Sequence, residues 1–174
     1  MARLLKGVAF SPSTVTSPAG HVLQVQSFYT TTQSSLTGST SDQIVNSMTK
    51  VITPLGSNSK FLVTVRWGGE SEDTWDKVYN IHMDGSRVNS AGSGSYEGLV
   101  CASNTYSNGI NDSSTPDVLI FSTLVSTSSV IGTDITFSLV TSGSATSVTW
   151  SNRCFAGGTN EVFTGELIIT EIKG

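Results

Sequence analysis

Charge, cysteine, histidine and long apolar runs are all scarce in this sequence. Asp, Glu, Lys and Arg make up 13% of its 174 residues, about half the share of about 25% that is usual in globular proteins. No apolar run approaches the roughly 20 residues of a membrane-spanning helix. Ser11-Pro12 also ends the first apolar stretch before it could form a signal-peptide core. We therefore expect neither membrane insertion nor a cleaved signal.

The charges that are present do not favour a nucleic-acid partner. The formal net charge is −4, and the nine Lys and Arg residues are scattered along the chain. Proteins that bind nucleic acid need a basic patch that neutralises phosphates. No such patch is expected here, and nucleic-acid binding is not predicted.

The residues that usually carry chemistry are few. His21 and His82 are the only histidines, and two cannot complete a structural zinc site without nearby thiolates. A hydrolase nucleophile elbow has the spacing Gly-x-Ser-x-Gly, which the stretch at residues 92–95 (Gly-Ser-Gly-Ser) does not match. We predict no catalytic residue, no metal and no cofactor, and both histidines are expected to be ordinary surface residues.

Cys101 and Cys154 are the only cysteines, too few for a disulfide framework in a chain of this length. We expect two small buried apolar side chains. A single disulfide between them is the alternative.

What the chain does have is hydroxyl groups. Ser and Thr together make up roughly 30% of the residues, so the polarity is carried by hydroxyls instead of charges. Thr packs well on pleated strands, while Ser and Gly suit turns. This composition predicts an all-β protein with many short connections.

Strand periodicity supports that prediction. At residues 61–67, Phe, Val, Val and Trp alternate with polar residues, which is typical of a half-buried antiparallel strand. Residues 42–53 are taken as a strand, with one capped helical turn as the alternative. Asp84-Gly85 predicts a type I′ hairpin, and residues 117–125, apolar on both faces, predict a central strand. Eight or more strands indicate an antiparallel two-sheet sandwich of jelly-roll type.

The chain divides into an arm and one domain. Residues 1–20 contain two prolines among small polar residues, which predicts an extended N-terminal attachment arm, with Arg3, Leu4, Leu5 and Lys6 as its contact residues. Residues 21–174 are expected to form the sandwich domain.

Short segments of the chain carry a family resemblance. They are residues 22–25, residues 51–54 together with 57–63, and residues 166–172. With these segments the chain, from residue 22 to residue 174, resembles small β-sandwich proteins of tailed-phage virions. Such proteins occur as tail-fibre tips and as head decoration or knob proteins, notably in phages of marine bacteria. The resemblance implies a homotrimer that binds a major capsid or tail protein, and it implies no catalytic residues. The expected location is the virion, assembled in the bacterial host cytoplasm.

An acidic stretch outside that resemblance is the first candidate site. Glu70, Glu72, Asp73 and Asp76 fall within seven residues of a predicted loop. Carboxylates at this density can hold calcium, but the spacing is not that of an EF-hand. A solvated acidic loop is the preferred interpretation. A contact with a partner's basic patch and a glycosidase acid and base pair are the alternatives.

Trp75 lies inside the same stretch. An exposed Trp beside carboxylates can stack on a sugar ring while the acids accept hydrogen bonds from its hydroxyls. Packing of Trp75 onto the sandwich or into a subunit contact is the alternative.

These observations favour a non-enzymatic virion structural protein, a trimeric capsid decoration or appendage subunit held by its N-terminal arm. The short arm leaves no room for a fibre shaft, which favours a head decoration protein or a small appendage subunit over a complete tail fibre. The alternative is a tail-fibre tip that recognises host-surface carbohydrate through Trp75 and the acidic residues.

Overall fold

The computed structural model describes residues 18–71, 77–89, 97–101, 117–143, 148–152 and 162–174. In these ranges the chain forms strands and no helix, and so contains no helix suited to crossing a membrane. The strands are β1 (Val22–Thr30), β2 (Ser34–Thr37), β3 (Gln43–Ile52), β4 (Lys60–Ser71), β5 (Val78–Met83), β6 (Ser86–Arg87), β7 (Val100–Cys101), β8 (Asp117–Ser126), β9 (Ile135–Ser142), β10 (Val148–Ser151) and β11 (Gly165–Ile172).

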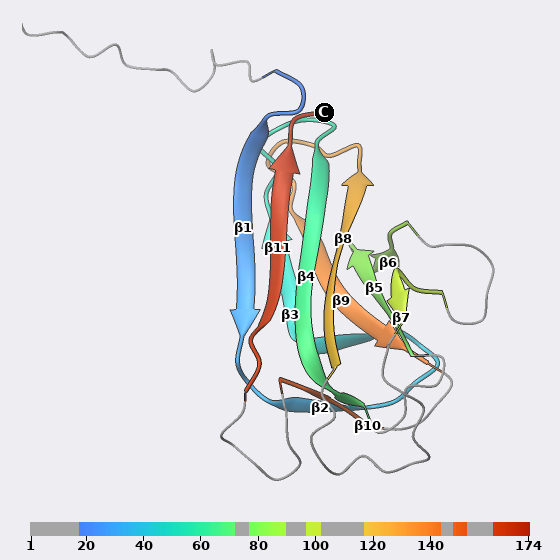
Figure 1. Cartoon of the computed structure of the whole chain (residues 1–174). Helices are drawn as coiled ribbons and strands as arrows, with labels where there is room; N and C mark the ends of the chain where they lie inside the picture. The colour runs from blue at the N-terminus through green and yellow to red at the C-terminus, as the bar shows by residue number, and fades with distance from the viewer. Residues whose placement is uncertain (1–17, 72–76, 90–96, 102–116, 144–147, 153–161) are drawn as a thin grey trace, which may run out of the picture.

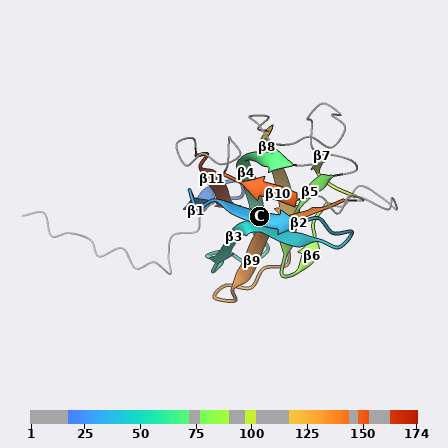
Figure 2. The same ribbon diagram turned by 90° about the horizontal axis from the view of Figure 1, so that it is seen from below.

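The strands form two antiparallel sheets that pack face to face. Sheet A has the order β1-β11-β4-β10-β2, with β8 on the free edge of β4, and sheet B has the order β3-β9-β5-β6, with β7 also paired to β5. Figure 1 shows β1, β11, β4 and β8 side by side, and Figure 2 shows that layer separated from β3 and β9. The predicted all-β antiparallel two-sheet sandwich is confirmed. Jelly-roll connectivity stays a prediction.

The core lies between the two sheets and confirms the periodicity of β4. Phe61 contacts Phe137 of sheet B with ring centroids 5.5 Å apart, and Trp67 contacts Tyr79 with centroids 5.0 Å apart. Such tilted aromatic pairs stabilise a core beyond their buried area. The inward side chains of β4 are all buried: Phe61, Val63, Val65 and Trp67.

β3 is a strand, as preferred, but it is interrupted. Its pairing with β9 passes from Ile44↔Val140 to Thr49↔Ser138, so extra residues of β3 bulge out of the ladder. Asn46 and Ser47 in the bulge have positive φ values of 45° and 54°. Asn tolerates this conformation better than most residues because its short polar side chain bonds locally. The left-handed backbone of the bulge is not a helical turn, so the strand interpretation holds for the whole of β3.

The hairpin prediction at Asp84-Gly85 is confirmed. Both residues have positive φ, 49° and 80°, as a type I′ turn requires. The turn joins β5 to β6, and the Asp84 carboxylate accepts a 2.8 Å hydrogen bond from the backbone N–H of Thr136. The hairpin is thereby tied to β9 beside it.

The prediction that residues 117–125 form a central strand is wrong. Among the described strands, β8 pairs only with β4 and forms an edge of sheet A. Its inward residues reach the core, but Val118, Ile120 and Leu124 on its other face are exposed. Apolar residues on both faces of a strand predict that both faces are covered by other elements of the same chain. Here the second face is exposed in the described structure, so the pattern does not identify what covers it.

The cysteine prediction is wrong for Cys101, which is exposed and a free thiol. It ends the two-residue strand β7, where it pairs with Val78. Val100 of the same strand packs against the core, whereas Cys101 at the end of β7 is exposed. Cys154 lies outside the described residues.

Candidate functional site

Most of the predicted site residues lie outside the part of the chain that the structure describes. This holds for the arm residues Arg3, Leu4, Leu5 and Lys6, and for Glu72, Asp73, Trp75 and Asp76 of the acidic stretch. Their predicted roles stay predictions. Within the described ranges, no three His, Cys, Asp or Glu side chains are grouped closely enough to hold a metal ion.

Glu70 is the exception, and its expected place in a surface loop is wrong. It lies within β4, whose ladder continues through pairing of Glu70 with Trp150, and its side chain is 0% exposed. β4 is longer than predicted because β10 pairs with its last residues. A carboxylate buried to this degree offers no atom to a ligand at the surface.

The outer face of sheet A is the most distinctive surface of the described residues. It is formed by the outward side chains of β1, β11, β4 and β8, which cross-strand pairing arranges in rows. One row joins Tyr29, Glu166, Arg66 and Ile120, and another joins Val25, Thr170, Leu62 and Leu124. Apolar side chains therefore gather on the two outermost strands of this face, with a more polar strip between them.

We name these two groups by their strands. The β1 ridge consists of Val25 and Tyr29, and Tyr29 is 72% exposed. The β8 ridge consists of Val118, Ile120 and Leu124, and Ile120 is 69% exposed. Adjacent strands are about 4.8 Å apart, so the two ridges run parallel about 14 Å from one another.

The polar strip between the ridges carries one ion pair. The Arg66 guanidinium lies 3.5 Å from the Glu166 carboxylate, with side chains 51% and 31% exposed. An exposed pair of this kind contributes at most about 1 kcal/mol. The Arg66 side chain can therefore turn toward another partner at little cost.

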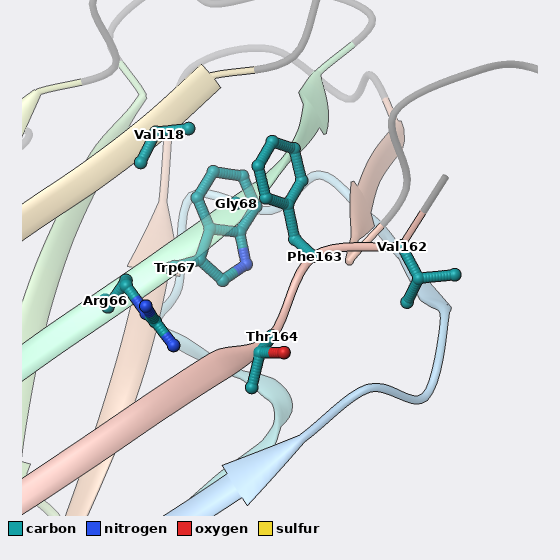
Figure 3. A pocket seen from close by; sticks show the side chains of 7 residues that line it. All are labelled: Arg66, Trp67, Gly68, Val118, Val162, Phe163 and Thr164. Carbon is teal, nitrogen blue, oxygen red and sulfur yellow. The ribbon is translucent and has the colours of Figure 1, made fainter. Parts of the chain in front are cut away.

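A pocket adjoins Arg66 at the end of the face where β4 continues toward β10 (Figure 3). We call it the Arg66 pocket. Its volume is about 310 Å³, at the lower limit of the size of ligand sites. Figure 3 shows Arg66 and Thr164 on one side of it and Phe163 and Val118 on the other. Its lining residues are Arg66, Trp67, Gly68, Val118, Val162, Phe163 and Thr164.

The floor of the pocket depends on Gly68. A Cβ added at this position would lie 2.6 Å from the Phe163 ring, closer than packed atoms can approach. The ring of Phe163 therefore lies directly on the backbone of β4. Trp67 faces the other way, and its indole N–H donates a 3.0 Å hydrogen bond to the Ser151 hydroxyl in the interior.

A buried carboxylate holds the connection between β3 and β4. Glu171 of β11 is 0% exposed, and it accepts hydrogen bonds from the Ser59 hydroxyl at 2.6 Å, the Gly56 N–H at 2.9 Å and the Leu55 N–H at 3.0 Å. The Gln24 amide adds a fourth donor at 2.7 Å. Burial alone would raise the pKa of Glu171, but these donors favour the charged form and hold the pKa below its usual value.

A second cluster joins sheet B to the start of β3. The Asp42 carboxylate accepts two hydrogen bonds from Arg87, at 2.6 and 2.7 Å, and lies 2.7 Å from His82 Nε2. Burial raises the pKa of Asp42, but the hydrogen bonds from Arg87, Ser142 and His82 outweigh it and lower the pKa to about 2. The His82 side chain is only 18% exposed and is hydrogen-bonded to Asp42. It is therefore not the ordinary surface residue that the sequence predicted.

The Asp42 cluster is suited to holding strands together. A Ser-His-Asp triad needs a hydroxyl nucleophile hydrogen-bonded to the histidine, and His82 has no such partner among the described residues. The bidentate Arg87–Asp42 contact instead ties β6 to the residue before β3.

No family model and no curated protein matches this chain. The fold and the outer face of sheet A are therefore the observations on which a function can rest.

Proposed function

We propose that this chain is a non-enzymatic structural protein of a tailed-phage virion. It forms a homotrimer of jelly-roll sandwiches and serves as a capsid decoration or appendage subunit. Residues 1–20 attach it to a major capsid or tail protein through Arg3, Leu4, Leu5 and Lys6. The resemblance of residues 22–174 to such proteins and the two-sheet β-sandwich both support this proposal.

The observation that carries the proposal is the outer face of sheet A. Apolar side chains scattered singly over a surface are normal, whereas apolar side chains gathered on one face mark an interaction site. Here two apolar ridges stand exposed on one face of a chain with few charges. Burial of this face against other copies of the chain accounts for both features.

Two measurements test the proposal. Light scattering coupled to gel filtration should give the purified chain three times its monomer mass. Quantitative mass spectrometry of purified particles should give hundreds of copies per virion, and a virion map should place the chain on the capsid lattice. A monomeric chain, or a chain absent from particles, would contradict the proposal.

The location also decides between the proposal and its alternative. Tens of copies at the tail would favour a receptor-binding tip that recognises host carbohydrate. That alternative rests on Trp75, Glu72, Asp73 and Asp76, since Glu70 is buried within β4.

A further inference from the structure

We propose that copies of this chain associate head to tail, with the β1 ridge of one copy packed on the β8 ridge of the next. In this contact the side chain of Tyr29 enters the Arg66 pocket of the neighbouring copy. The inference rests on the self-association in the proposed function and specifies the surfaces that make it.

The first argument is the register of sheet A. Tyr29 on β1 and Ile120 on β8 belong to one cross-strand row, through Glu166 and Arg66. The donor and acceptor surfaces of a head-to-tail contact therefore stand at the same height along the strands. A head-to-tail contact without a rise closes into a ring, whereas one with a rise continues as a filament. The register thus favours a closed ring about an axis parallel to the strands.

The second argument is the chemistry of the pocket. Tyr29 is the most exposed large apolar side chain of the described residues, and Tyr is enriched among the residues that dominate interface energies. The apolar wall of the pocket, formed by Phe163 and Val118, suits a phenol ring. Arg66 can stack on that ring through a cation–π contact, because its bond to Glu166 is weak.

The third argument is area. With residue areas of about 150–230 Å², the exposed fractions of the two ridges amount to about 500 Å². Since about 57% of a typical interface is apolar, this corresponds to a total interface of about 900 Å², near the size at which specific contacts begin. Each copy in a ring makes two such contacts.

Two other modes of self-association fit the structure less well. Strand addition along the free edge of β8 is hindered by Asn89, whose side-chain amide donates to the backbone carbonyl of Leu124 at 2.9 Å. A twofold contact of outer face on outer face would bury the strip between the ridges with Arg66 and Glu166 inside it. Burying such an ion pair costs several kcal/mol of desolvation.

The test uses two variants that each block one surface. Tyr29→Glu places a charge in the β1 ridge, and Ile120→Glu places one in the β8 ridge. Ile131→Glu is the matched control, because Ile131 is 62% exposed but lies in the β8–β9 connection. Circular dichroism establishes that all three variants are folded, and sedimentation or light scattering gives their masses.

Each blocked variant alone should be monomeric, and the Ile131 variant should keep the parent's mass. An equimolar mixture of the two blocked variants should form a 1:1 heterodimer and no larger species. This follows because the intact β8 ridge of the Tyr29 variant still accepts the intact β1 ridge of the Ile120 variant. A contact of β1 ridge on β1 ridge, or of β8 ridge on β8 ridge, gives no such complementation.

The outcomes separate the two proposals. A monomeric parent chain would overturn the self-association itself. An oligomeric parent whose Tyr29→Glu variant keeps the parent's mass would overturn only the head-to-tail contact. A mixture of monomeric variants that stays monomeric would likewise overturn that contact.

Discussion

The Glu171 carboxylate accepts a 2.6 Å hydrogen bond from the hydroxyl of Ser59, which stands 112 residues earlier in the chain. This bond joins the last strand of sheet A to the connection that precedes β4. The Leu55 and Gly56 N–H groups donate to the same carboxylate. The buried charge thus gathers three donors of the connection between the two sheets, and Ser129 makes further bonds to the same connection.

Glu171→Gln should lower the free energy of unfolding by about 2–4 kcal/mol, because the amide replaces an acceptor oxygen with a donor and leaves buried N–H groups unpaired. Urea denaturation measures the change. Glu166→Gln is the matched control on the same strand, and its loss should stay below about 1 kcal/mol. Equal losses for the two variants would show that the buried carboxylate network contributes no more stability than the exposed Arg66–Glu166 pair.

Stability should fall as the pH is lowered from about 5 toward 2. Asp42 and Glu171 both have lowered pKa values in the folded chain. A lowered carboxyl pKa adds stability above its unfolded value and loses it as the pH falls through the folded value. The pKa of Asp42 falls from 3.8 to about 2, which corresponds to about 2 kcal/mol. Urea midpoints across this range measure the loss.

Asp42→Asn isolates one part of that dependence. The variant should be less stable at neutral pH and should show a shallower loss of stability in acid. An unchanged slope between the parent and this variant would show that the Arg87–Asp42 contact does not respond to pH.

Gly68→Ala should displace Phe163 and cost about 1–3 kcal/mol, because the added Cβ would overlap the ring. A double-mutant cycle provides the control. In a Phe163→Ala background, the same Gly68→Ala change should be nearly neutral, since the overlapping ring is gone. Additive losses would indicate that the cost at Gly68 comes from the backbone.

Removal of residues 1–20 should leave a folded chain with the parent's oligomeric mass. The removed segment precedes β1, and its described part takes part in two backbone bonds, from Gly20 N–H to the Lys173 carbonyl and from His21 N–H to the Pro18 carbonyl. The truncated chain should no longer join virions in a reconstitution assay. Attachment that survives the deletion would contradict the arm proposal.

The carboxylate network had a signal in the sequence. In β11, Leu167, Ile169 and Glu171 share the inward period and are all buried, while Glu166 faces outward. A carboxylate in register with core residues requires hydrogen-bond donors. The donors could not be named, because Ser59 and Gln24 reach it only through the packing of the sheets.

The Arg66 pocket and the β1 ridge had no comparable signal. Alternation places Arg66 on the outward side of β4, but the approach of Phe163 to Gly68 depends on how the segment before β11 crosses β4. Tyr29 likewise continues an alternating strand, and its exposure depends on what lies over sheet A.

The sequence by itself determined the fold class, the inward residues of β4 and the type I′ hairpin. These follow from side-chain period and from the φ preferences of single residues, which are local properties of the chain. The tertiary structure decided that β8 is an edge strand, that Glu70 and Glu171 are buried, and that Tyr29 and Ile120 share one row. Those facts depend on which strands pair and in what register. Strand pairing brings together residues that are far apart in the sequence, and a local residue pattern does not show which they are.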